Sequence, residues 1–145
     1  VGWAVLGVDG GATGPLLGMF FMGMSEAAGG KESFDAHGLA AAFAAGRASV
    51  GAQTKARPGD KTMVDALVPA VEAAQAAAES GADILSVLQR AADAAAEGAA
   101  STKDMQARFG RARNIKELSI GTPDAGATSV SFIFAGFLKG IETHA

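Results

Sequence analysis

Four short loops of this chain carry residue types from which a phosphate site can be built: "GGATGP", "KARPGDKTM", "GRAR" and "GTPDAGATS". Glycines allow the backbone to approach a ligand closely, and Thr13 or Thr128 can add a hydroxyl group. Two of the loops come directly before predicted helices, whose free N–H groups and positive dipole ends suit phosphate oxygens. The lysine of a Walker loop does not follow the first glycines, so the charge would have to come from elsewhere.

Each candidate also has a structural interpretation, and taken alone none decides between the two. Asp60 and Asp124 are typical of helix caps and turns. Met63 fits either a hydrophobic core or the face of an adenine ring. Glycine beside a helix start is most often a cap.

Three arginines, Arg108, Arg111 and Arg113, form a basic cluster in the sequence. By default such a cluster is a solvated surface. Its functional interpretation is the neutralisation of phosphates by guanidinium groups. His37 and His144 stand apart from any partner pattern, so we expect neither a metal site nor a catalytic triad around them.

The composition narrows the class of protein. A net charge of −3 argues against nucleic-acid binding, and the absence of cysteine excludes disulfides and thiolate metal sites. No apolar run reaches the roughly 18 residues of a membrane helix. We expect a cytoplasmic protein.

The elements that must position these loops are predicted to be helices. Alanine, the best helix former, occupies 34 of 145 positions. Apolar spacing and caps predict helices over residues 15–28, 34–53, 61–80 and 84–102, a shorter piece over 102–110, and a last helix from Gly126 or Ala127. Asp60 and Asp83 are the expected N-caps of the third and fourth helices, Pro69 should kink the third, and residues 111–125 should form a loop. The prediction is an all-α, single-domain antiparallel bundle over residues 1–145.

In their fixed order, the stretches "GGATGPLLGMFF", "PGDKTMVDALVPAVE", "TKDMQARFGRAR" and "SIGTPDAGATS" resemble the nucleotide-binding subunit or domain of dihydroxyacetone kinases, the DhaL type. The resemblance extends from about Val1 to Leu138. It implies a barrel of antiparallel helices that holds ADP or ATP at one end between interhelical loops.

The resemblance also implies which residues border the nucleotide. Thr13 stands where the family often has serine, Thr54 stands where glycine is common, and "TPDAG" replaces a frequent "HQDPG". The implied nucleotide-binding residues are Gly11, Ala12, Thr13, Thr54, Met63, Arg111, Asp124, Ala125 and Gly126. No catalytic residue is assigned.

One family feature is missing from the chain. The family holds Mg²⁺ with an aspartate cluster of the type "GDGDHG", and Asp9 lacks such paired acids. The chain also begins at Val1 with "VGWAVLG", which looks like the tail of a helix. We therefore expect the C-terminal two-thirds of a DhaL-type domain, about six helices with an exposed apolar flank, and magnesium ligands outside this chain.

The resemblance implies a phosphotransferase component that works with a dihydroxyacetone-binding kinase subunit or domain. The phosphate would come either from ATP or, through bound ADP, from a phosphohistidine protein of the sugar phosphotransferase system. A homodimer is a further expectation, with no nucleic acid and no membrane as partner. The alternatives are a non-catalytic nucleotide-binding regulatory module and a helical scaffold whose glycine loops are only caps.

Overall fold

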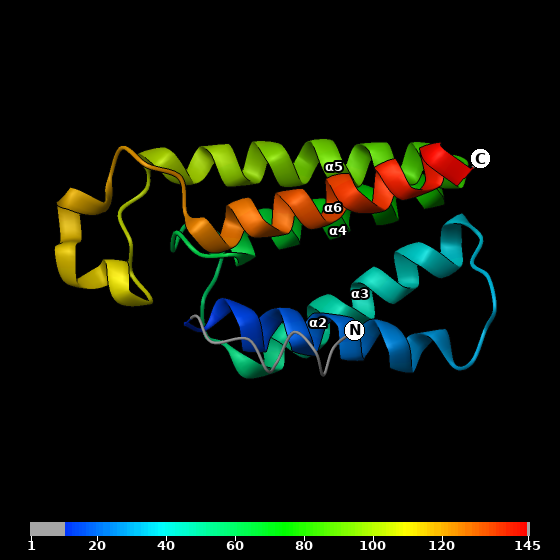
Figure 1. Cartoon of the computed structure of the whole chain (residues 1–145), viewed down its shortest axis with the longest axis horizontal. Helices are drawn as coiled ribbons and strands as arrows, with labels where there is room; N and C mark the ends of the chain where they lie inside the picture. The colour runs from blue at the N-terminus through cyan, green and yellow to red at the C-terminus, as the bar shows by residue number, and fades with distance from the viewer. Residues whose placement is uncertain (1–10, 145) are drawn as a thin grey trace.

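The computed structural model describes residues 11–144, and these form helices and loops without a β-strand. The predicted all-α class is confirmed. The elements, labelled as in Figure 1, are α2 (Thr13–Ala28), α3 (Ala36–Gln53), α4 (Val64–Glu79), α5 (Ile84–Ser101), the 3₁₀ segments η1 (Thr102–Asp104) and η2 (Arg111–Ser119), and α6 (Ala125–His144).

The five α-helices alternate in direction along the long axis of the molecule (Figure 1). Helix α2 packs against α3, α4 packs against α5, and α6 lies along α5 and α4. Because of this alternation, α2, α4 and α6 all begin at the same end of the bundle, where α3 and α5 end (Figure 1). The loops singled out in the sequence are therefore gathered at one end.

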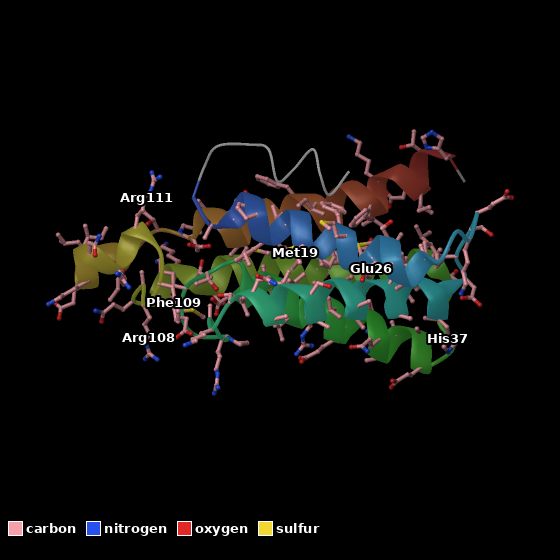
Figure 2. All side chains as sticks on the ribbon, turned by 90° about the horizontal axis from the view of Figure 1, so that it is seen from below. Met19, Glu26, His37, Arg108, Phe109 and Arg111 are labelled. Carbon is pink, nitrogen blue, oxygen red and sulfur yellow. The ribbon has the colours of Figure 1, made fainter. Side chains whose placement is uncertain are left out.

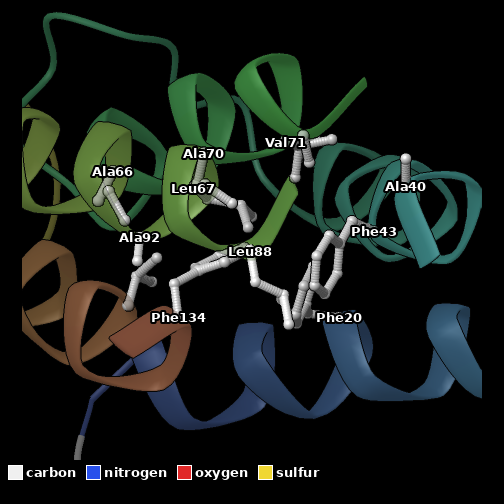
Figure 3. Packing of buried hydrophobic residues seen from close by; sticks show 14 of the residues in the cluster. Phe20, Ala40, Phe43, Ala66, Leu67, Ala70, Val71, Leu88, Ala92 and Phe134 are labelled. Atoms are coloured by element: carbon white, nitrogen blue, oxygen red, sulfur yellow. The ribbon is translucent and has the colours of Figure 1, made fainter. Parts of the chain in front are cut away.

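Phenylalanine rings fill the centre of the bundle where three helices meet. Phe20 of α2, Phe43 of α3 and Phe134 of α6 are fully buried (Figure 3), and the rings of Phe43 and Phe134 meet edge to face with centroids 5.1 Å apart. A Cβ at Gly46 would overlap Phe20, so glycine is what lets α2 and α3 lie this close. The aromatic contacts fix how the α2–α3 pair sits on α6.

Alanines fill the interface between α4 and α5. The buried side chains there include Ala66, Ala70 and Ala74 of α4 and Ala91 and Ala95 of α5. Small side chains allow close helix packing, which explains how an alanine-rich stretch contributes to a core rather than to a disordered segment. Helix α4 continues through Pro69 without a break in its assignment.

The predicted helix boundaries were right for some helices and wrong for others. Asp83 caps α5 as predicted, since its side chain accepts a hydrogen bond from the Ser86 N–H at 2.8 Å. Helix α4 begins three residues later than predicted because Lys61 has a φ of 59°, which no right-handed helix allows.

The segment between α5 and α6 also differs from the prediction. The helical piece predicted over 102–110 is limited to η1, because the backbone turns extended at Met105. Residues 111–119, predicted as loop, form two short helical pieces on either side of a kink at Lys116, together labelled η2, and α6 begins at Ala125, slightly earlier than expected.

The surface carries some large apolar side chains. On α6, Phe132 is 71% exposed, and Ile115 and Leu118 of η2 are also exposed. Within residues 11–144, none of the helices combines the length and the apolar character that crossing a bilayer requires.

Candidate functional site

A cavity of about 490 Å³ lies at the end of the bundle where α2, α4 and α6 begin. Its wall contains the first residues of these three helices, Thr54 after the end of α3, and the start of η2. Three helix N-termini face one space, so the positive ends of three helix dipoles point towards it, although the Val64 and Ala127 N–H groups already donate to Thr62 Oγ1 and Asp124 Oδ2. Such a space suits an anion.

The nine site residues predicted from the sequence all line this one cavity: Gly11, Ala12, Thr13, Thr54, Met63, Arg111, Asp124, Ala125 and Gly126. They come from five separate segments of the chain. Met63 is 2% exposed, whereas Gly11, Ala12 and Arg111 are accessible to solvent. Met63 is thus deep in the wall, and Arg111 lies near the mouth.

Gly126 joins two of the helix N-termini. A Cβ at this position would lie 2.7 Å from Thr13 Oγ1 and 3.3 Å from Met63 Cβ. A methyl group at this position would have to displace the Thr13 hydroxyl and press on the Asp124 carboxylate and Met63. Gly126 is therefore in close contact with residues at two other helix N-termini.

Asp124 is the cap of α6. Its Oδ2 accepts a hydrogen bond from the Ala127 N–H at 2.8 Å, and its own N–H donates to Thr102 Oγ1 at 2.7 Å. Burial raises the pKa of the Asp124 carboxyl, although the N–H groups of Ala127 and Gly126 and the charge of Lys61 oppose this rise. The carboxylate is thus held by the helix start, in keeping with its cap interpretation.

The prediction that Asp60 caps the helix after it was wrong. Asp60 Oδ2 accepts from the Arg57 N–H at 2.8 Å, and Met63 occupies the N-cap position of α4 without a side-chain cap bond. The carboxylate that serves the start of α4 is Asp65, whose Oδ2 accepts from the Thr62 N–H at 2.7 Å. Asp60 closes the preceding turn because Lys61, in the left-handed region, separates it from the helix.

The three arginines have different surroundings. Arg108 lies 3.7 Å from Asp60 through Nη1 and Oδ1, and its N–H donates to the Asp60 carbonyl. Arg111 lines the cavity, whereas Arg113 is exposed and outside the lining. Figure 2 shows Arg108 and Arg111 pointing to opposite sides of the loop. Only one of the three is thus placed at the cavity. Thr128, the alternative hydroxyl, donates to the Asp124 carbonyl within its own helix.

Sequence reasoning missed part of the wall. The additional lining residues are Leu16, Ala56, Lys61, Thr62, Val64, Phe109, Gly110 and Ala112. Most of them stand next to residues that were predicted, so their loops had been found. Lys61 differs from the others, because lysine side chains are rarely buried and nothing in the sequence indicates that the Lys61 side chain is buried.

The chain matches the DAK2 domain over residues 1–139. It belongs to the DAK2 domain family. Among its relatives, the ADP-binding subunit DhaL of the PEP-dependent dihydroxyacetone kinase of Escherichia coli is 42% identical over 91% of this chain and 63% of its own length. A second DhaL subunit, from Listeria innocua, is 39% identical over 97% of the chain and 65% of its own length. The chain therefore spans a little under two-thirds of these two DhaL subunits.

Larger proteins contain the same DAK2 region. Human triokinase/FMN cyclase is 36% identical over 92% of this chain, which covers 23% of that protein. The crystal structure of the dihydroxyacetone kinase of C. freundii superposes with a TM-score of 0.63 at 26% identity, covering 96% of this chain and 22% of that one. The helical arrangement described above is thus a DAK2 fold.

Residues 11–144 contain no carboxylate cluster of the kind that the resemblance implies for magnesium. Within 11–144, no group of three or more histidine and carboxylate side chains lies close enough together to hold a metal ion. Asp9 lies outside the described residues.

Proposed function

We propose that this chain is the nucleotide-binding part of a kinase that phosphorylates dihydroxyacetone or a similar short ketose or polyol, with ADP or ATP in the cavity at the helix N-termini. The observation that carries the proposal is that four loops, far apart in the sequence, line one cavity with nine residues expected to border a nucleotide. The names of its relatives, which are ADP-binding subunits and kinases, give the ligand class.

The wall divides into parts that suit the two ends of a nucleotide. The backbone N–H groups at Gly11 and Ala12 and the Arg111 guanidinium would bind phosphate oxygens. Met63 and Phe109 supply apolar surface for the base. Phosphoryl transfer needs positioning and charge stabilisation rather than covalent help from the protein, so this wall would orient the phosphates.

The substrate would be held by a separate kinase subunit or domain that docks at the open end of the cavity. No described side chain is assigned as a catalytic acid or base, and the carboxylate in the cavity lining, Asp124, accepts an N–H of the helix that it caps. The whole enzyme is proposed to work in the cytoplasm, where both nucleotides are at hand, and a homodimer is one further arrangement.

Two phosphate sources fit the cavity equally. Bound ADP would act as a coenzyme if a phosphohistidine protein of the sugar phosphotransferase system rephosphorylates it, and ATP would exchange freely in the other case. Incubating the ADP-loaded protein with a phosphohistidine donor distinguishes them. Label appearing in bound ATP supports the coenzyme route, and steady ATP turnover without such transfer supports the exchange route.

Calorimetric titration of the protein from its complete gene with ADP tests the nucleotide site itself. We expect saturable binding that adenosine cannot match, because phosphates supply most of the contacts. An absence of binding at millimolar ADP would contradict the proposal and favour the scaffold. Binding with no transfer to any ketose in the presence of the partner subunit would favour a regulatory module.

A further inference from the structure

Lys61 is a buried cation in the cavity wall. The whole residue is 4% exposed to solvent. Its Nζ donates one hydrogen bond to the Thr102 carbonyl at 2.8 Å and another to the Thr122 carbonyl at 2.6 Å. Neither of the ion pairs found among residues 11–144 involves Lys61. Two backbone carbonyls, rather than a carboxylate, hold this ammonium group.

The two carbonyls flank the neck of one loop, which is the point where the two ends of the loop come together. Residues 103–121 form a loop that leaves the end of α5 and returns towards α6. The two ends of this loop meet where the Gly121 N–H donates to the Lys103 carbonyl at 2.8 Å. Lys61 binds the residue just before this neck and the residue just after it. The loop carries Arg111 and its neighbours to the cavity.

The same contact supports the start of α6. Thr102 is fully buried, and its Oγ1 accepts the Asp124 N–H at 2.7 Å while donating to the Ala99 carbonyl. The Lys61 ammonium, through the Thr102 carbonyl and the Thr122 carbonyl, therefore contacts both segments that lead into the Asp124 turn. One side chain connects the start of α4, the end of α5 and the start of α6.

This arrangement costs stability. Lys61 is one of two non-glycine residues with positive φ in the described part of the chain. Its ammonium group is buried without a carboxylate in direct contact, which is unfavourable even with the Asp124 charge nearby. Packing alone would be served better by an apolar side chain. The lysine therefore points to a task in ordering the cavity wall rather than to stability.

We propose that Lys61 is a positioning residue that clamps the neck of the 103–121 loop and thereby holds Arg111 over the cavity. This deepens the proposed function and rests on it for the identity of the ligand, but the clamp itself is a property of the protein alone. Its two consequences can be measured separately.

Amide hydrogen exchange tests the clamp without ligand. In Lys61→Met we expect the amides of Gly121 and Asp124 to exchange about tenfold faster or more than in the unchanged protein, with α2 and α3 unaffected. Lys103→Met is the matched control, because it removes an exposed lysine at the same neck and should leave these rates unchanged. Unchanged Gly121 and Asp124 exchange in Lys61→Met would overturn the proposal.

A double-mutant cycle, with the Kd for ADP as its readout, tests whether Lys61 affects nucleotide binding through Arg111. Lys61→Met and Arg111→Ala should each raise the Kd for ADP by about tenfold. The double variant should also raise this Kd by about tenfold rather than a hundredfold, because Lys61 acts through Arg111. Multiplied effects, or an unchanged Kd in Lys61→Met, would overturn the positioning role. If Lys61→Met does not fold, Lys61→Gln, whose amide still donates to one carbonyl, serves in both experiments. If the unchanged protein does not bind ADP, the proposed function fails while the exchange result still decides the clamp.

Discussion

Two hollows of similar size lie on this molecule. The cavity at the helix N-termini measures about 490 Å³, and a second hollow between α4 and α5 measures about 530 Å³. The second is lined by Ala73, Ala76, Ala77, Ser80, Arg90, Asp93, Ala94 and Glu97. Volume alone therefore does not distinguish them.

The backbone makes the difference. Along α4 and α5 the N–H groups are used by the helices themselves, so the second hollow offers a ligand only side chains. At the first cavity three helices begin, so the positive ends of their dipoles face a ligand, and those first N–H groups that do not bond local acceptors can bind it. A hollow at helix starts can bind anions in a way that a hollow along helix flanks cannot.

The largest expected effect comes from Gly126→Ala, whose added methyl group would displace the Thr13 hydroxyl and press on Met63 in the wall of the first cavity. The added Cβ meets Thr13 and Met63, so we expect a loss of about 1–3 kcal/mol in the free energy of unfolding and more than about tenfold in ADP affinity. Denaturant unfolding and calorimetry measure the two. Gly136→Ala in the same helix is the control, because nothing lies within 4 Å of its Cβ position, and it should not destabilise. Equal effects of both would contradict the role of close approach.

Removing one arginine from each hollow compares how much the two hollows contribute to ADP binding. Arg111→Ala removes the guanidinium at the first cavity and should weaken ADP binding about tenfold or more, since a phosphate loses a charged partner. Arg90→Ala removes an arginine of the second hollow and should leave the Kd within about twofold. Calorimetric titration of both variants checks this. Matching losses would show that the arginines act only through net charge.

Substitution of Asp124 should change the free energy of unfolding and the way in which this free energy depends on pH. Asp124→Ala should lose about 1 kcal/mol because the cap bond to Ala127 disappears, while Asp124→Asn keeps a capping oxygen and should lose little. Burial raises the pKa of Asp124 above 3.8, so the folded state holds the proton more tightly than the unfolded one. Its contribution to stability is thus present at low pH and is lost as the pH rises through the raised pKa.

The stability difference between the unchanged protein and Asp124→Asn isolates this titration. Urea unfolding from pH 3.5 upward should show the difference falling with rising pH and then levelling. A difference that rises with pH would mean that the charged carboxylate is favoured in the folded state.

The smallest effect is expected from filling the second hollow. Ala76→Leu adds an apolar side chain to an exposed position of α4, and we expect changes within about 0.5 kcal/mol in unfolding and no change in ADP affinity. Thermal unfolding and titration check both. A loss of ADP binding in this variant would mean that the second hollow, too, serves the nucleotide.

Much of the fold could be read from local patterns. The alanine content, the apolar spacing and Asp83 before "ILSV" depend on neighbours in the chain, and each correctly indicated a helix or its start. Errors arose where a contact across the fold overrides the local pattern. Lys61 and Thr62 read as helix, yet the left-handed backbone at Lys61 delays α4 until Val64.

The same division applies to the cavity. The glycines, Thr13, Arg111 and the Asp124 turn could be named in advance because the order of their motifs resembles that of DhaL-type domains, although each motif taken alone left a structural interpretation open. The pairing of Arg108 with Asp60, and the burial of Lys61, join residues more than forty positions apart. Local sequence carries no record of such pairs.

The sequence by itself determined an all-α chain with four loops suited to an anion, since helix propensity, capping and glycine freedom are local properties. Only the tertiary structure decided that these loops share one cavity, because that follows from the alternating directions of five packed helices (Figure 1). It also decided that Lys61, rather than the exposed lysines, lies in the wall, since burial depends on what packs around a residue.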